Sequence, residues 1–320
     1  MTNVDEAARS LSAVVAEVRK VVAGQQEVID QAVMGLISGG HVLVEGVPGL
    51  GKTLLVKALA KTINGSFARI QFTPDLMPAD VTGHTLYDPS SGKFATRKGP
   101  IFAHFVIADE INRAPAKTQA ALLEVMQEAQ VTIEGESHVL PQPFMVFATQ
   151  NPIEHEGTYP LPDAQLDRFL MHVRIGYPTA EDEVALTRQV TTATVGDRLS
   201  VETVNAVIDP SVVAGLQNLA ASLTVDDAVL GYAVRLARTT RDNQNLSRGA
   251  GPRASIALVR CARARALMAG RTFATPDDVK SVALAVLRHR VSVAPELEIE
   301  GRDADSVLAE MLTEVEAPRL

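Results

Sequence analysis

The sequence has few of the residue types that stabilise secreted proteins or mark membrane segments. Its 320 residues include no tryptophan, 4% aromatics and one cysteine, Cys261. A single cysteine excludes an intrachain disulfide and fits a reducing compartment, so we expect a cytoplasmic protein. No apolar run approaches the ~18 residues of a transmembrane segment, and the N-terminus lacks a secretory signal pattern. The seven histidines show no metal-ligand spacing, which argues against a protein-bound zinc.

Acidic residues outnumber basic residues in the chain as a whole, but the balance differs between segments. The net charge is -8, which argues against nucleic acid as a partner of the general surface. Residues 233–290, however, hold 12 basic and 3 acidic residues, and residues 291–320 hold 2 basic and 8 acidic residues. A basic segment next to an acidic one requires a structural or functional explanation.

Five short apolar runs predict the strands of a buried sheet, and helical periodicity lies between several of them. Strands that are apolar on both faces and alternate with helices predict a mainly parallel five-stranded sheet in a three-layer α/β fold. The runs are residues 41–45, 68–72, 105–108, 144–148 and 169–173. Turn signals predict two hairpin insertions, near residues 82–98 and 131–142.

The pattern changes after about residue 178, where helical periodicity replaces strand-like runs. Helices are predicted at 179–192, 226–242, 254–269 and 276–288, with apolar spacing typical of a helix at 212–223. We therefore expect an α/β core over residues 1–195, a linker at 196–208, and an all-helical domain over 209–320 that ends in an acidic tail.

One stretch matches G-x-x-x-x-G-K-[ST], a phosphate-binding loop, and it lies in the required context between a predicted strand and a predicted helix. Glycines let the backbone N–H groups surround phosphate, and the helix N-terminus adds partial positive charge. Lys52 should contact the β- and γ-phosphates, and the Thr53 hydroxyl should bind Mg²⁺. The loop consists of Gly46, Val47, Pro48, Gly49, Leu50, Gly51, Lys52 and Thr53.

Two acidic residues, Asp109 and Glu110, follow the predicted strand at 105–108. After a phosphate-binding loop, this placement predicts that Asp109 helps to hold Mg²⁺ and that Glu110 polarises the attacking water. Together these motifs predict a Mg²⁺-dependent nucleoside triphosphatase, and the absence of an N-K-x-D-type guanine-binding motif favours ATP over GTP, and so an ATPase with ATP and Mg²⁺ as cofactors.

Three further polar residues have more than one interpretation from the sequence alone. Asn151 follows the predicted strand at 144–148 and suits either a γ-phosphate contact or a turn, because Asn-Pro is common in turns. Arg168 precedes the last predicted strand, and Arg253 begins a helix of the C-terminal domain. Either guanidinium suits charge neutralisation at a γ-phosphate, and either suits an ordinary solvated surface.

The motifs, in their order, resemble those of the MoxR family of AAA+ ATPases, in the helix-2-insert clade. The resemblance runs from about Val22 to Arg290 and includes three long strings, Gln71–Asp80, Ala108–Lys117 and Ala148–Glu154. It implies a P-loop αβα core with a helical lid.

The resemblance also implies roles for individual residues. Asn151 would be the sensor-1 residue, Arg168 the arginine finger acting on a neighbouring subunit's nucleotide, and Arg253 the sensor-2 arginine of the lid. Residues 22–25, which include Gly24 and Gln25, would line the adenine side of the pocket. Arg113 and Arg174 are also near predicted subunit edges and remain alternatives for the finger.

The expected protein is an ATP-hydrolysing, chaperone-like remodeller that forms a homo-oligomeric ring, by resemblance a hexamer. Family members assist maturation of, or cofactor insertion into, partner proteins, often ones with von Willebrand factor A domains. The basic segment would then face ATP phosphates or an acidic face of an adjacent subunit. Two alternatives stay open: a nucleic-acid-dependent motor, and a nucleotide-switched scaffold with little hydrolysis.

Overall fold

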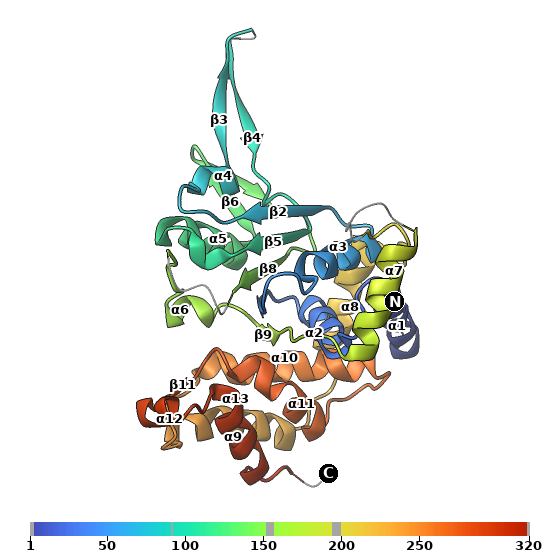
Figure 1. Cartoon of the computed structure of the whole chain (residues 1–320), viewed down its shortest axis with the longest axis vertical. Helices are drawn as coiled ribbons and strands as arrows, with labels where there is room; N and C mark the ends of the chain where they lie inside the picture. Colours follow the sequence, from blue (N-terminus) through green and yellow to red (C-terminus); the bar gives the residue numbers. More distant parts are fainter. Residues whose placement is uncertain (1–2, 91, 152–156, 194–199, 319–320) are drawn as a thin grey trace.

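The computed structural model describes residues 3–90, 92–151, 157–193 and 200–318, and its centre is a parallel sheet (Figure 1). All four strand pairings are parallel, in the order β2-β5-β8-β1-β9, which confirms the predicted five-stranded sheet. The strands are β1 (Val42–Glu45), β2 (Phe67–Gln71), β5 (Phe105–Asp109), β8 (Met145–Gln150) and β9 (Met171–Arg174).

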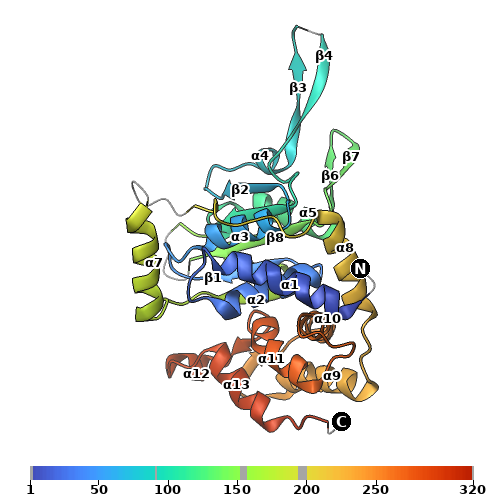
Figure 2. The same ribbon diagram turned by 90° about the vertical axis from the view of Figure 1, so that its right-hand side faces the viewer.

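Both faces of the sheet are buried because successive side chains of each strand point to opposite sides. Val42 and Val44 of β1 join one apolar cluster, which includes α1, α2 and α3, whereas Leu43 joins another, which includes α5. These helices therefore form the outer layers (Figure 2). The core helices are α1 (Val4–Arg19), α2 (Gln26–Ile37), α3 (Lys52–Thr62), α4 (Pro78–Thr82), α5 (Ala116–Glu128) and α6 (Asp163–Leu166), with a 3₁₀ turn, η1, at Ile111–Arg113.

The two predicted hairpins are both present and extend from the same end of the core (Figure 2). The first pairs β3 (Gly83–Asp88) with β4 (Lys93–Lys98), and the second pairs β6 (Gln130–Ile133) with β7 (Glu136–Val139). On the first, Tyr87 and Phe94 are 55% and 75% exposed, and their ring centroids lie 5.3 Å apart. An exposed aromatic pair without a hydrophobic partner is a common feature of binding surfaces.

The connection between the two predicted domains runs along the core. Its first part falls on residues 194–199, outside the described residues, after α7 (Ala180–Ala193). Further on, the Val207 amide donates to Thr62 O at 2.7 Å, and the Asn205 amide donates to Glu17 Oε2 at 2.8 Å. The helix that follows, α8 (Pro210–Ser222), packs against both α2 and α10. The linker is thus held to the surface of the core.

The C-terminal domain is helical, as expected, with one addition. Its helices after α8 are α9 (Asp227–Asp242), α10 (Pro252–Met268), α11 (Pro276–Leu287), α12 (Pro295–Ile299) and α13 (Ala304–Glu314). The addition is an antiparallel ladder of β10 (Leu246–Arg248) and β11 (Ser292–Val293), which corrects the all-helical expectation. Strands of two and three residues are too short to carry a period-2 pattern.

This domain, the lid, packs against the β9 edge of the sheet through the end of α11. His289 Nε2 donates to Phe169 O at 3.1 Å, and Arg290 Nη2 donates to the same oxygen at 2.5 Å. Arg288 Nη1 donates to His172 O at 3.0 Å. Burial and then the charge of Arg290 hold the pKa of His289 well below its usual value, so the ring is neutral. Carbonyls at the sheet edge are satisfied by the lid.

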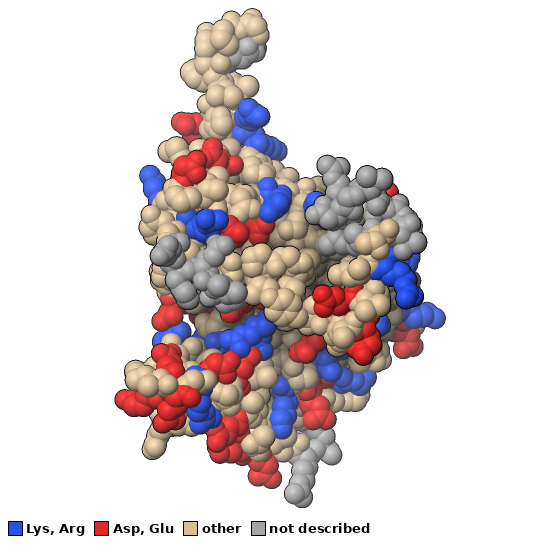
Figure 3. All heavy atoms as spheres, in the orientation of Figure 1, with Lys and Arg blue, Asp and Glu red and all other residues tan. Residues whose placement is uncertain are grey.

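Much of the basic segment is used inside the chain. Arg260 donates to the carbonyls of Ser38 and Gly39, and Arg263 donates to Leu223 O at 3.0 Å. Figure 3 shows acidic side chains over the outer part of the lid and basic ones along its junction with the core. No helix among the described residues has the length and apolarity needed to cross a membrane.

Candidate nucleotide site

The phosphate-binding loop has the backbone geometry that its glycines predict. Gly49 (φ +87°) and Gly51 (φ +79°) adopt left-handed conformations, and a Cβ at either position would meet no atom within 4 Å. Their role is therefore conformational rather than a matter of packing. Gly46 differs, because a Cβ there would lie 2.8 Å from Ile175 O. The loop follows β1 and opens α3, as expected.

Lys52 lies over this loop. Its Nζ donates to Gly46 O, and it also lies 3.4 Å from Val47 O. The ammonium is thus held at the mouth of the loop by neutral carbonyls, where a phosphate oxygen would be a stronger, charged acceptor.

Asp109, at the carboxyl end of β5, is 8% exposed and fully engaged by neighbours. Its Oδ1 accepts from Thr149 Oγ1 at 2.6 Å, and its Oδ2 lies 2.5 Å from Arg69 Nη2. Together with the Thr53 hydroxyl in the same cavity, it offers hard oxygen donors. Mg²⁺ is bound through one or two protein oxygens plus phosphate and water, so this donor set fits it.

Glu110 has a strained backbone at φ 56° and ψ 51°, a region that costs a non-glycine residue about 1–3 kcal/mol. Its amide donates to Thr149 Oγ1 at 2.9 Å, which helps to hold this conformation. Its Oε2 accepts from Gln71 Nε2 at 2.8 Å and from Arg113 Nη1 at 3.0 Å. The carboxylate is therefore positioned by two side chains that sequence reasoning did not assign to it.

One cavity of about 350 Å³ brings the predicted chemistry together. Asn151, 7% exposed at the end of β8, lies in it with both acidic residues. The lining residues are Pro48, Gly49, Gly51, Lys52, Thr53, Leu54, Lys57, Arg69, Asp109, Glu110 and Asn151. The residue after Asn151 begins the segment 152–156, which lies outside the described residues.

A second cavity, of about 260 Å³, shares the loop residues Pro48, Gly49 and Gly51 with the first. Its other walls come from residues 21–25 and from the start of α7, and they are largely apolar, as a purine ring requires. Gln25 lines it and donates from Nε2 to Gly176 O at 2.9 Å. Gly24 is not among the lining residues, but it allows the turn (φ +67°) that brings this segment close to Asp182.

Arg168 and Arg253 lie elsewhere. They line a different cavity, of about 240 Å³, together with Gly40, His41 and Leu170. These last residues precede β1 and β9, whereas the phosphate-binding loop follows β1. The two arginines therefore lie near the N-terminal ends of β1 and β9, whereas the loop of their own chain lies at the C-terminal end of β1. Arg253 Nη1 is 3.8 Å from Asp167 Oδ2.

The described part of the lid lies away from the phosphate-binding loop of its own chain. No described residue of α8–α13 lines either cavity that contains the loop. The physical reason is that α10 and α11 bury their apolar faces against α1, α2 and β9. The other finger candidates have partners within the chain, Glu110 for Arg113 and Glu45, Asp303 and Asp305 for Arg174.

Among the described residues, no group of three or more His, Cys, Asp or Glu side chains is placed to hold a metal ion. Cys261 is fully buried, and burial raises the pKa of its thiol to about 11. It packs in the lid as a small apolar residue.

Comparison with known proteins gives matches over nearly the full length. The family model for the "ATPase family associated with various cellular activities (AAA)" matches residues 41–171, and that for the AAA lid domain matches residues 238–311. The Chaperone MoxR1 of Mycobacterium tuberculosis is 42% identical, over 97% of this chain and 83% of its own. The Protein MoxR of Methylorubrum extorquens is 32% identical, over 88% of each chain.

A solved structure agrees with these relatives. The crystal structure of a putative ATPase from Cytophaga hutchinsonii is 40% identical to this chain and superposes with a TM-score of 0.90, covering 99% of this chain and 97% of the other. Both the core and the lid are therefore shared.

Proposed function

The chain belongs to the MoxR family of AAA+ ATPases, and we propose that it binds ATP with Mg²⁺ and removes the γ-phosphate by hydrolysis. The cycle of ATP binding and hydrolysis would drive the remodelling of partner proteins. The observation that carries the proposal is the single cavity that joins the phosphate-binding loop to Asp109, Glu110 and Asn151. The ATP phosphates would lie against the loop and Lys52, and the adenine would lie in the apolar cavity beside Gln25.

Each side chain in the cavity has a defined task in the proposed reaction. Thr53 and Asp109 hold Mg²⁺, which supplies neutralisation of the phosphate charge. Glu110 orients and polarises the attacking water, with its carboxylate held by Gln71 and Arg113. Asn151 donates from its amide to the water or to the γ-phosphate.

The positions of Arg168 and Arg253 support action in trans within a homo-oligomer, which we propose to be a hexameric ring. Neither arginine lines either of the two cavities that contain the phosphate-binding loop of its own chain. If a neighbouring subunit placed its phosphate-binding loop against the surface that carries Arg168 and Arg253, both guanidinium groups would meet the γ-phosphate of the ATP bound there. Hydrolysis would then require assembly.

The hairpin β3–β4 supports contact with a client protein. Leu86, Tyr87 and Phe94 are 46%, 55% and 75% exposed on an element that extends from the core (Figure 1). By family resemblance, we propose partner proteins that carry von Willebrand factor A domains and undergo maturation or cofactor insertion in the cytoplasm. A nucleic-acid motor is less well supported, because Arg260, Arg263 and Arg290 are bonded within the chain.

The test compares Glu110→Gln with a matched control, Glu298→Gln, on the exposed side of α12. We expect Glu110→Gln to bind a fluorescent ATP analogue normally but to lose phosphate release about 100-fold or more, while Glu298→Gln keeps wild-type turnover. Unchanged turnover in Glu110→Gln would remove this residue from its role. Displacement of the analogue by GTP as effective as by ATP would overturn the adenine assignment.

Partner choice needs a separate experiment. Glu110→Gln should accumulate the ATP-bound assembly, so affinity capture with it should retain client proteins that the same variant carrying Tyr87→Ser and Phe94→Ser does not. Equal capture with and without the aromatic pair would exclude the hairpin as the client contact.

A further inference from the structure

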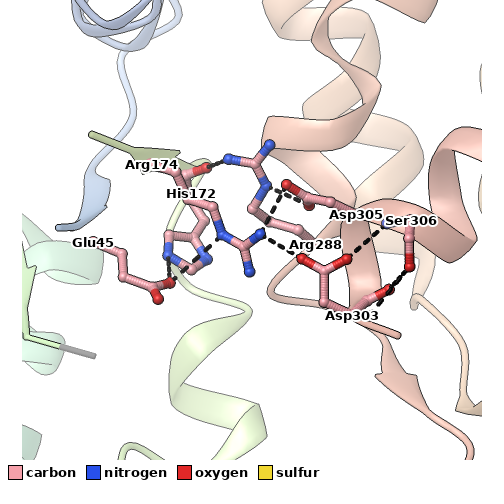
Figure 4. A network of polar contacts seen from close by, with 7 residues as sticks. All are labelled: Glu45, His172, Arg174, Arg288, Asp303, Asp305 and Ser306. Carbon is pink, nitrogen blue, oxygen red and sulfur yellow. Dashed lines mark hydrogen bonds and ion pairs between the residues drawn. The ribbon is translucent and has the colours of Figure 1, made fainter. Parts of the chain in front are cut away.

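A network of charged side chains connects the phosphate-binding loop to the lid (Figure 4). It begins at Glu45, the last residue of β1 and the immediate neighbour of Gly46. Glu45 Oε2 lies 2.8 Å from His172 Nε2 and 3.8 Å from Arg174 Nε, both on β9. The close contact with His172 is the main reason why the pKa of Glu45 lies below its usual value.

The other end of the network is in the lid. Arg174 Nη1 lies 2.9 Å from Asp303 Oδ2 and 3.0 Å from Asp305 Oδ2, around the start of α13. Arg288 Nε donates to Asp305 Oδ1 at 2.9 Å, and its Nη1 donates to the main chain of β9. We refer to Glu45, His172, Arg174, Arg288, Asp303 and Asp305 as the clamp.

Arg174 is the member that bridges the two domains. One guanidinium contacts the carboxylate before the loop and two carboxylates of the lid. The neighbouring His172 and Arg288 side chains are 10% and 9% exposed, whereas Arg174 and Asp303 are 40% and 53% exposed, so the bridge lies at the solvated rim of the clamp. An exposed ion pair contributes little to stability by itself, so the importance of Arg174 lies in the three carboxylates that it contacts across the two domains.

One end of the clamp is next to the phosphate-binding loop in sequence, and the other end belongs to the domain that carries Arg253. On one side, Gly46 O accepts from Lys52, the residue that would move to the phosphates. On the other side, the lid carries Arg253 beside Asp167 and Arg168. A shift of the loop that moved Glu45 would therefore alter the contacts of Arg174, which also holds the carboxylates of Asp303 and Asp305 in the lid.

We propose that Arg174 is a positioning residue that couples nucleotide binding at a subunit's own loop to the placement of the arginines that its lid offers to the next subunit. The proposal rests on the proposed ATPase function. It differs from a finger role, because Arg174 acts through the lid and touches no nucleotide. Coupling of this kind needs an element with two positions that both sites bias, and the lid is that element.

The first test uses ion-pair variants with a matched control. Arg174→Ala breaks the bridge, and Asp303→Asn with Asp305→Asn breaks it from the lid side while keeping side-chain shape. Arg302→Ala removes an ion pair of similar exposure, Arg302 with Glu310, that lies within the lid alone. Thermal melts monitored by circular dichroism confirm that each variant is folded.

We expect the clamp variants to bind the ATP analogue within about twofold of wild type, to lose roughly tenfold in kcat, and to lose cooperativity in ATP concentration. Arg302→Ala should match wild type in all three. Arg174→Lys should recover part of the kcat, because an ammonium still meets the lid carboxylates. Clamp variants with wild-type kcat and cooperativity would overturn the proposal.

The second test measures lid position directly. Spin labels at Glu124→Cys on α5 and Glu314→Cys on α13 report the distance between core and lid in the Glu110→Gln background. We expect ATP to shift this distance in the parent and in Arg302→Ala, and not in Arg174→Ala. An equal shift in Arg174→Ala would refute the coupling alone, whereas a parent that binds no ATP would refute the proposed function and the coupling with it.

Discussion

Arg290 is a nearly buried charge at the junction of lid and core, and its removal gives a measurable prediction. Its side chain is 3% exposed. Nε donates to Asp167 Oδ1 at 2.8 Å, and the two terminal nitrogens donate to the carbonyls of Phe169, Leu170 and Val286. We consider Arg290→Met, which keeps most of the side-chain volume and removes every donor.

The magnitude follows from what each acceptor loses. Phe169 O keeps its hydrogen bond from His289, and Asp167 is 27% exposed and keeps Arg253 at 3.8 Å, so both are partly compensated. Leu170 O and Val286 O lose a donor in a dry environment, at about 1–3 kcal/mol for each unsatisfied group. Removing one partner of a fully buried charge pair costs about 3–5 kcal/mol in total. This value serves as a comparison and is not added to the cost of the two carbonyls, because Asp167 stays partly solvated. We expect a loss of about 3–5 kcal/mol in the free energy of unfolding.

The assay is urea unfolding followed by circular dichroism, with Arg302→Met as the control. Arg302 pairs with Glu310 at 2.5 Å, but the two side chains are 33% and 53% exposed, so its loss should cost less than about 1 kcal/mol. A loss for Arg290→Met as small as that of the control would show that the carbonyls of β9 reach water or other donors, and would refute the reasoning.

Three further predictions concern assembly, pH and salt. Arg168→Ala should retain ATP-analogue binding and lose hydrolysis by about 10³-fold or more, and mixing it with Lys52→Ala should restore activity in mixed rings; no recovery on mixing would place the finger elsewhere. Burial alone would raise the pKa of Asp278, but hydrogen bonds from Arg271 and Thr275 hold it below its usual 3.8, so its stabilising effect is complete above that pH and is lost as pH falls further. The melting temperatures of wild type and Asp278→Asn should therefore converge in acid, and a constant difference would contradict this. Association measured by sedimentation in the presence of ATP should weaken as salt rises, because the proposed interface brings the guanidinium groups of Arg168 and Arg253 to the phosphates of the next subunit.

The strands and the phosphate-binding loop could be predicted because their signals are local. Val42, Leu43 and Val44 are apolar in sequence because both faces of β1 are covered, and the loop needs only its glycines and Lys52 in a short stretch. Such patterns need no knowledge of neighbouring elements.

The partners of the acidic residues could not be predicted, because strand order is not encoded locally. Gln71 pairs in register with Asp109 only because β2 lies beside β5, and Thr149 reaches Asp109 only because β8 lies on the other side. Polar residues at the ends of predicted strands were the available signal, and without the order of the sheet they could not be assigned to one another.

The position of the lid could not be predicted, for a similar reason. The sequence of α10 and α11 shows which residues are apolar but not which surface of the core they cover. That choice is made by long-range contacts, such as those of His289 and Arg290 with the β9 main chain. The sequence therefore places Arg253 in the C-terminal domain but does not indicate that it lies beside Arg168, near the start of β9.

The separation of the two half-sites along β1 has a consequence for symmetry. The loop follows this strand, and the arginine pair lies near the start of the strand. Each subunit therefore has a loop surface and an arginine surface that do not meet within the same subunit. A two-fold dimer repeats one contact twice and cannot join these unlike surfaces in the same way as head-to-tail stacking does. In an open row of subunits, one terminal loop lacks arginines and one terminal arginine pair faces solvent. Under the proposed mechanism, closing the row into a ring is the step that makes every site equivalent.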